Sequence, residues 1–411
     1  MSSQASLIGL TPEQRTHFTW LDASYLKAVI AALDAVDPGG SRFVGGCVRD
    51  SLLGEQPKDF DVATRLTPDE VIGALKAAQL GAAPTGLAHG TVTAIADHQG
   101  VEVTTLRSDV ETDGRRAVVA FTKDWAHDAN RRDFCMNAIY ATPDGNLFDP
   151  VGGLADIAAR RVAFIGDAEL RIREDYLRIL RFFRFTARFS KDFDQTGLAA
   201  CARLKIGIGD LSAERIGAEL MAVLALPRAG FALKAMDDTG ILAQIWDTPA
   251  KLVAFDRLKL ISPNVEAPVA LGVLFGEAGD GIGTRLRLSN AEKAIRSKSL
   301  KGAKTIERDM SEPQARILIY QLGRDVFQDA IAVAHACDSI DRSDQERLQL
   351  IADNWMPPVL PISGRHIVGE GVKPGPEVAK TLALIEQQWI DEGFPDADRV
   401  HEILKIQIST Q

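Results

Sequence analysis

The 411-residue sequence has few cysteines, no long hydrophobic run and no excess of positive charge. Its four cysteines are scattered and show neither the spacing of metal ligands nor that of a disulfide framework. No apolar stretch approaches the length that spans a bilayer. The first 14 residues are polar and lack the basic start and apolar run of a signal peptide. The simplest expectation is a cytoplasmic protein.

The formal net charge of -9 argues against an indiscriminate nucleic-acid binder, because contacts to phosphates require local cations. Arginines nevertheless concentrate in one segment, at Arg160, Arg161, Arg171, Arg173, Arg178, Arg181, Arg184 and Arg188. Such a stripe is usually a solvated helix face, but beside a nucleotide site it is also suited to an RNA backbone. The length predicts roughly two to four domains.

The most informative stretch is residues 43–64, which read FVGGCVRDSLLGEQPKDFDVAT. The pattern predicts a strand, a break at Gly45 and Gly46, a short helix and a second strand with Asp59 and Asp61. The glycines allow backbone N–H groups to approach an anion, and the helix that follows favours the same charge. Two carboxylates on one side of a strand repel each other, which favours a hard cation such as Mg²⁺ between them. Each feature alone is common in turns and strand ends, but their combination indicates a triphosphate and metal site.

This stretch resembles the signature of the nucleotidyltransferase superfamily, and in detail the bacterial branch of tRNA CCA-adding enzymes and poly(A) polymerases. The resemblance implies that Asp59 and Asp61 hold the catalytic metals. It also implies that Gly45, Gly46 and Arg49 contact the phosphates of the incoming nucleotide.

The expected fold class is α+β. An N-terminal nucleotidyltransferase head with a small mixed β-sheet flanked by helices precedes an all-helical neck, body and tail. We place the head at residues 23–155, the neck at 156–225, the body at 226–300 and the tail at 301–411.

Residues 90–96 and 101–106 flank a short polar turn and predict two strands. Val101 and Val103 share one face of the second strand, and Glu102 lies on the other. A carboxylate in an apolar strand is costly to bury without a partner. We hypothesise that Glu102 is a third catalytic carboxylate; the alternative is an edge-strand glutamate that faces water.

Residues 130–140, NRRDFCMNAIY, match the second motif of the same family. The match implies that Arg132, Asp133 and Asn137 contact the sugar and phosphates, whereas the residues alone also fit a solvated helix start. The polar segment 107–117 resembles the flexible loop that helps CCA-adding enzymes change from cytidine to adenosine addition. This loop favours the complete reaction over the addition of two cytidines.

Residues 173–185 predict a helix in the neck. Asp175 and Arg178 are three apart, so an ion pair within the helix is the ordinary explanation. The family motif instead implies a protein template, to which we add Arg181 as a nucleotide-binding residue. A carboxylate accepts from the exocyclic amine of cytosine or adenine, and a guanidinium donates to their ring acceptors. Guanine and uracil would leave these groups unpaired.

Residues 211–219 match the last neck motif, in which we interpret Glu214, Arg215 and Glu219 as structural. The Gly- and Pro-rich residues 361–376 predict a loop that resembles the part of the family's tail that holds the tRNA elbow. His366 stands where that segment usually has an aspartate.

The sequence therefore predicts a Mg²⁺-dependent tRNA nucleotidyltransferase that adds or repairs the 3′ CCA end with CTP and ATP. A poly(A) polymerase or a partial CC- or A-adding enzyme shares these motifs. A non-catalytic RNA-binding protein on the same scaffold is disfavoured by the intact Asp59 and Asp61.

Overall fold

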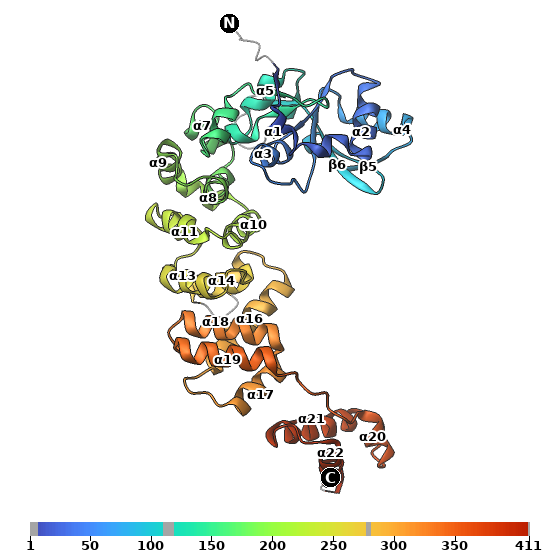
Figure 1. Cartoon of the computed structure of the whole chain (residues 1–411), viewed down its shortest axis with the longest axis vertical. Coiled ribbons are helices and arrows are strands. Elements are labelled where there is room, and N and C mark those ends of the chain that lie inside the picture. The colour runs from blue at the N-terminus through green and yellow to red at the C-terminus, as the bar shows by residue number, and fades with distance from the viewer. Residues whose placement is uncertain (1–6, 110–118, 277–280, 410–411) are drawn as a thin grey trace. The chain divides into compact units, whose positions relative to one another are not determined.

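A computed structural model describes residues 7–109, 119–276 and 281–409. The chain forms two compact units (Figure 1), one of residues 1–219 and 235–245 and the other of residues 220–234 and 246–411. The division into head, neck, body and tail stays a prediction.

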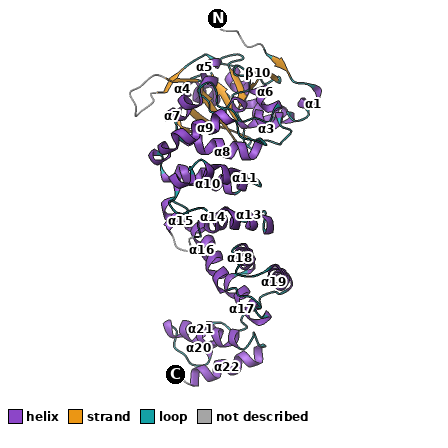
Figure 2. Ribbon diagram, turned by 90° about the vertical axis from the view of Figure 1, so that its left-hand side faces the viewer, coloured by secondary structure: helices purple, strands orange, loops and turns teal. Residues whose placement is uncertain are grey.

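The first unit contains an eight-stranded mixed sheet in the order β1-β10-β9-β2-β3-β6-β5-β4, with β7 and β8 as a separate pair (Figure 2). Among the described strands, β3 and β6 pair in parallel and all other neighbours are antiparallel. The strands are β1 (Ile8–Gly9), β2 (Ser41–Val44), β3 (Asp61–Thr64), β4 (Gly81–Gly86), β5 (Thr91–Ala96), β6 (Gln99–Thr105), β7 (Arg107–Asp109), β8 (Val119–Phe121), β9 (Tyr140–Ala141) and β10 (Asn146–Phe148).

Helices cover this sheet and continue the first unit. They are α1 (Pro12–Arg15), α2 (Ser24–Asp34), α3 (Gly46–Leu52), α4 (Pro68–Ala77), α5 (Trp125–Asn130), α6 (Gly153–Ala158), α7 (Ala168–Glu174), α8 (Leu177–Phe189), α9 (Gln195–Leu204) and α12 (Leu242–Ile245), while α10 (Ala213–Leu224) and α11 (Ala229–Asp238) are divided between the units. The mixed sheet with its helices confirms the predicted fold class.

One face of the sheet is apolar and carries α2 and α4. Phe43 pairs with Val62 across β2 and β3, and both are buried. The Phe43 ring packs against Trp20 with 4.9 Å between ring centroids, and α2 and α4 contact β5 and β6. Helix α4 begins at Pro68, where Thr67 and Glu70 form a capping box.

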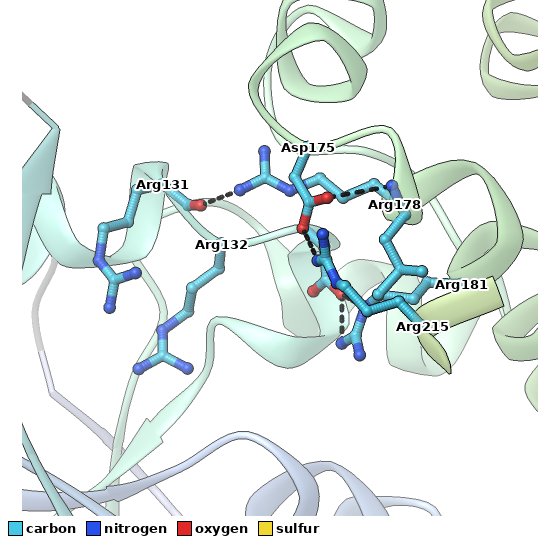
Figure 3. Close-up of a pocket in the computed structure, with 8 residues that line it drawn as sticks. Arg131, Arg132, Asp175, Arg178, Arg181 and Arg215 are labelled. Atoms are coloured by element: carbon cyan, nitrogen blue, oxygen red, sulfur yellow. Dashed lines mark hydrogen bonds and ion pairs between the residues drawn. The ribbon is translucent and has the colours of Figure 1, made fainter. Parts of the chain in front are cut away.

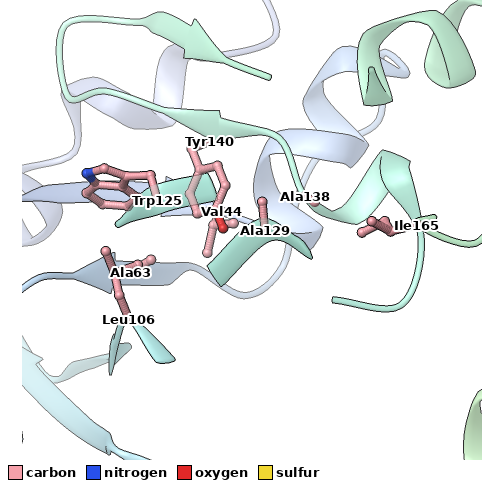
Figure 4. Packing of buried hydrophobic residues seen from close by; sticks show 8 residues of the cluster. All are labelled: Val44, Ala63, Leu106, Trp125, Ala129, Ala138, Tyr140 and Ile165. Atoms are coloured by element: carbon pink, nitrogen blue, oxygen red, sulfur yellow. The ribbon is translucent and has the colours of Figure 1, made fainter. Parts of the chain in front are cut away.

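The opposite face carries a second apolar cluster beneath α5 (Figure 4). Its buried members are Val44, Ala63, Leu106, Trp125, Ala129, Ala138, Tyr140 and Ile165. The guanidinium of Arg42 lies 4.2 Å from the centre of the Trp125 ring, which adds a cation–π contact. These contacts fix α5, and the arginines that follow it, on the same face of the sheet as Asp61.

The predicted neck helix is interrupted, contrary to the expectation for residues 173–185. Asp175 is extended, with φ of -156° and ψ of 105°, and it separates α7 from α8. Its side chain explains the break, because Oδ1 accepts a hydrogen bond from the backbone N–H of Leu177 at 3.1 Å. Asp175 and Arg178 therefore do not share one continuous helix.

The second unit contains only helices among its described residues. Besides its parts of α10 and α11 these are α13 (Leu252–Ile261), α14 (Ala267–Phe275), α15 (Gly281–Arg285), α16 (Asn290–Thr305), α17 (Glu312–Leu322), α18 (Arg324–Ala336), α19 (Arg342–Asn354), α20 (Gly364–Gly369), α21 (Pro376–Asp391) and α22 (Ala397–Ser409). In the described part of the chain, no helix is both long and apolar enough to cross a membrane.

The segment predicted as a Gly- and Pro-rich loop contains the short helix α20. Ser363 caps this helix, and the Nδ1 atom of His366 accepts a hydrogen bond from the Ser363 backbone N–H at 3.0 Å. His366 thus completes a capping box, which explains why a helix forms among the glycines.

Candidate active site

Asp61 and Glu102 lie side by side on two neighbouring strands. Asp61 opens β3, and its register partner in the parallel strand β6 is Glu102. Residues paired in this way project from the same face of a sheet. Asp59 lies in the bend before β3 and is exposed, so the prediction that one strand carries both aspartates is wrong. The strand is shorter than predicted because its ladder with β2 ends at the Val44 and Asp61 pair.

A cavity of about 270 Å³ opens on these carboxylates. Its lining residues are Val44, Asp61, Val62, Thr91, Glu102, Thr104, Arg107, Arg131 and Arg132. Burial raises the pKa of Asp61 to about 6, and the nearby Glu102 and Asp59 charges add to this effect while Arg132 and Arg49 oppose it. A cationic partner would stabilise the charged form of this carboxylate, and carboxylate oxygens are ligands that a hard divalent ion prefers.

The residues present fit a divalent cation by their donor chemistry. Within the described ranges, no three or more His, Cys, Asp or Glu side chains converge closely enough to hold a metal ion. The neighbouring Asp61 and Glu102 supply the anionic oxygens, with Asp59 near enough to affect the pKa of Asp61. The assignment of Asp59 and Asp61 as metal ligands stays a prediction.

The raised pKa of Asp61 predicts a stability change in metal-free protein. The folded-state pKa of about 6 exceeds the ordinary 3.8 of an aspartate, so protonation of Asp61 stabilises the fold. This contribution is fully present below about pH 4 and is lost as the pH rises through about 6. We expect Asp61→Asn to raise the Tm of the first unit by about 3 °C at pH 7.5 without metal. Scanning calorimetry at pH 7.5 and pH 4 would measure this shift.

The pH 4 scan is the internal control, since Asp61 is then protonated and the variant should melt with the wild type. An unchanged or lower Tm of the variant at pH 7.5 would contradict the inference that the charge of Asp61 destabilises the fold.

Gly45 lies directly beside Asp61. It has a φ of +74° and precedes α3, and a Cβ built on it would lie 3.7 Å from Asp61 Oδ2. The positive φ favours glycine there. Gly46 begins α3, and a Cβ on it would lie 3.8 Å from the guanidinium of Arg49.

Arg49 is buried and bound to protein partners. Its Nε donates to Asp50 Oδ1 at 2.8 Å and its Nη1 donates to Asn137 Oδ1 at 2.7 Å. The guanidinium also lies 4.4 Å from the centre of the Phe189 ring. The contact of Arg49 with phosphates stays a prediction. The structure adds a structural role, in which Arg49 binds Asp50 and Asn137.

A polar network continues from Arg49 to α8 and α10. Asn137 donates to Asp133 Oδ1 at 3.0 Å, and Asp133 Oδ2 accepts from Arg181 Nε at 2.8 Å. Glu219 accepts from Arg184 Nε at 2.6 Å and lies 3.8 Å from Arg181. The network therefore joins several residues that the sequence assigned separately to the nucleotide, and Glu219 has the structural role predicted for it.

A second cavity, of about 300 Å³, contains the predicted base-selecting residues (Figure 3). Its lining residues are Arg131, Arg132, Asp133, Asp175, Leu177, Arg178, Arg181 and Arg215. The sequence treated Arg215 as structural, but Arg215 Nη2 donates to Asp175 Oδ2 at 2.7 Å inside this cavity. No local signal indicated this, because the two residues are 40 apart in the chain.

Arg178 does not pair with Asp175. Its Nη1 donates to Glu174 Oε2 at 2.6 Å and to the Arg171 carbonyl at 2.9 Å, and its Nη2 donates to the Arg131 carbonyl at 2.8 Å. The ordinary explanation, an ion pair between Asp175 and Arg178, is therefore wrong. Both side chains still face the same cavity.

Arg131 and Arg132 line both cavities, and the buried Asp128 pairs with both. The sequence analysis missed Asp128. Its positions three and four residues before the two arginines, a spacing typical of ion pairs on a helix, were the available signal. The predicted loop at 107–117 lies mainly outside the described residues, which omit 110–118.

The fold and the site define a nucleotidyltransferase. Residues 41–163 match the model of the poly A polymerase head domain. That span contains the glycines at the start of α3, the carboxylates of β3 and β6, and the arginines after α5.

Relatives that align with most of the chain show which family of nucleotidyltransferases it belongs to. The mitochondrial CCA tRNA nucleotidyltransferase 1 of Mus musculus is 35% identical over 367 residues, which are 86% of this chain and 83% of the relative. The CCA-adding enzyme of Levilactobacillus brevis is 30% identical over 86% of this chain and 90% of the relative. The chain belongs to the CCA tRNA nucleotidyltransferase family.

Solved structures share the fold. A Bacillus stearothermophilus CCA-adding enzyme in complex with CTP has a TM-score of 0.70 at 24% identity and covers 94% of this chain and 98% of its own. A Thermotoga maritima CCA-adding enzyme complexed with tRNA has a TM-score of 0.61 at 18% identity and covers 98% of this chain and 96% of its own.

Proposed function

We propose that this protein adds or repairs the 3′-terminal CCA of tRNA, using CTP and ATP and releasing pyrophosphate. The observation that carries the proposal is the continuity of the site in a chain of this family: Arg131 and Arg132 line both the cavity of Asp61 and Glu102 and the cavity of Asp175. A nucleotide with its triphosphate near the carboxylates and its base near Asp175 would contact both arginines.

In this proposal Asp59, Asp61 and Glu102 hold Mg²⁺. The bound ions would supply activation of the terminal 3′-hydroxyl and charge stabilisation on the triphosphate. The role of the protein itself is to present carboxylate oxygens from β3 and β6 on one face of the sheet. The raised pKa of Asp61 supports this role, because such a carboxylate gains from a cation.

Base selection falls to Asp175 and Arg178. Asp175 accepts from Arg215 and from the Leu177 N–H, and a carboxylate oxygen retains a further lone pair for an exocyclic amine. In the described part of the chain, Nε of Arg178 makes no hydrogen bond, and it would donate to a ring acceptor of cytosine or adenine. Both groups are fixed by protein contacts, which favours discrimination against guanine and uracil.

The remaining predicted residues would hold the sugar and phosphates. Arg132 and Arg181 supply cations at the cavity that Asp133 also lines, and Asn137 braces Asp133. Gly45 and Gly46 allow close approach to the backbone, and Arg49 supplies charge behind them. The helical second unit, including α20, would hold the tRNA.

The test is the sequencing of products from tRNA transcripts that end before CCA, after C and after CC, incubated with Mg²⁺, CTP and ATP. We expect all three to end in CCA, with no incorporation from GTP or UTP. Long A tails would favour a poly(A) polymerase, and a stop at CC would favour a partial enzyme. An absence of nucleotide addition would overturn the proposal.

A further inference from the structure

We propose that Asp128 is the positioning residue for Arg131 and Arg132, and through them for the triphosphate of the incoming nucleotide. This inference rests on the proposed function. Asp128 lies on α5, is 1% exposed and lines neither cavity, so it acts through the two arginines and not by touching substrate.

The Asp128 carboxylate binds both arginines at once. Oδ1 accepts from Nε and Nη2 of Arg131 at 3.0 and 2.9 Å. Oδ2 accepts from Nε and Nη2 of Arg132 at 3.2 and 2.9 Å. Each guanidinium is therefore held through two nitrogens, which fixes its plane as well as its position.

Two further donors fix the carboxylate itself. The hydroxyl of Tyr140 donates to Oδ2 at 2.7 Å, and the backbone N–H of Arg107 donates to Oδ1 at 3.1 Å. Tyr140 belongs to β9 and Arg107 begins β7, so Asp128 is tied to two strands. Trp125 and Ala129 anchor the same helix in the apolar cluster.

The electrostatics agree with this geometry. Burial alone would raise the pKa of Asp128, but the charges of Arg132 and Arg131 outweigh it and hold the pKa well below its usual range. The carboxylate thus stays charged and offsets one of two adjacent positive charges. The arginine side chains are only 17% and 20% exposed, and they present the remaining charge to both cavities.

A carboxylate that holds two cations in place supplies preorganisation. Without it, two neighbouring guanidinium groups would repel each other and leave the positions that a triphosphate requires. Misplacement of binding groups by about 1 Å can cost about a hundredfold in rate. Asp128 is therefore expected to affect nucleotide binding and addition through Arg131 and Arg132, in addition to the stability that its two buried ion pairs contribute.

The experiment is a double-mutant cycle with Asp128→Asn, Arg132→Ala and the double variant. It measures the Kd for CTP by calorimetry, and KM and kcat for cytidine addition to tRNA lacking CCA. Each single variant is expected to weaken kcat/KM about a hundredfold, mostly through KM. The double variant should lose less than the product of the two single effects, because Asp128 acts in part through Arg132 and otherwise through Arg131.

Asp156→Asn is the matched control, because Asp156 is also 1% exposed and pairs with an arginine, Arg161, outside both cavities. It should leave KM unchanged, and it should lower the Tm less than Asp128→Asn does because the Arg161 side chain is 55% exposed. Multiplying effects in the double variant, or an unchanged KM in Asp128→Asn, would overturn the inference. If the wild type binds CTP but adds no nucleotide, the proposed function fails while the Kd cycle still tests Asp128.

Discussion

Replacing Asp61 by asparagine is expected to lower the rate of cytidine and adenosine addition by on the order of 10³-fold. Asparagine keeps the shape of the side chain but removes an anionic oxygen from the face that Asp61 shares with Glu102. Single-turnover addition to a tRNA transcript lacking CCA, at saturating CTP and Mg²⁺, would measure the loss. The same variant is expected to be more stable without metal, so inactivity cannot arise from unfolding.

Asp69→Asn is the control, since Asp69 is an exposed carboxylate in the first turn of α4. It should retain the activity of the wild type. Asp59→Asn and Glu102→Gln extend the series and are expected to lose at least tenfold. If Glu102→Gln turned over normally, Glu102 would be a solvent-facing strand residue without a catalytic role. If Asp61→Asn were active, the proposed carboxylate site would be refuted.

Replacing Arg49 by methionine is expected to destabilise the first unit by about 3 kcal/mol. Arg49 is 7% exposed and pairs with the buried Asp50, and its loss would leave that carboxylate with Arg188 at 3.4 Å. Removing one partner of a buried ion pair leaves an uncompensated charge, which costs more than the pair itself contributes. Calorimetric unfolding of the full chain, resolved into its transitions, would measure the effect.

Arg188→Met is the matched control, because the Arg188 side chain is 41% exposed. It pairs with the buried Asp50 at 3.4 Å and with the more exposed Glu55 at 3.0 Å. It should cost under about 1 kcal/mol. A double Arg49→Met, Asp50→Leu variant should recover much of the loss if the unpaired carboxylate is its cause. If Arg49→Met is as stable as Arg188→Met yet binds CTP poorly, Arg49 serves the phosphates and not the fold.

Local sequence patterns account for much of the secondary structure and for the face of β6 on which Glu102 lies. The start of α4 is encoded locally, because the hydrogen bonds of the capping box between Thr67 and Glu70 span only three residues. Alternation in residues 101–106 placed Glu102 on the face opposite Val101 and Val103, which are buried. The side-chain period of a strand requires no knowledge of its neighbours.

Other local expectations were wrong where a side chain competed with the backbone. Asp175 accepts from the Leu177 N–H and breaks a helix that the apolar spacing predicted. His366 caps α20 in a segment whose glycines indicated a loop. In both cases a side chain forms hydrogen bonds with groups two or three residues away, which accompanies the observed backbone conformation.

The sequence by itself determined the class of the fold and the strand and turn around Gly45, and it predicts the residues that bind metal and nucleotide. These properties depend on periodicity and on residue types that are close in the chain. Only the tertiary structure decided which of these residues are neighbours. Asp61 faces Glu102 because β3 and β6 pair in parallel, and Asp175 meets Arg215 across 40 residues. Pairing across such separations depends on strand register and helix packing, which no local pattern encodes.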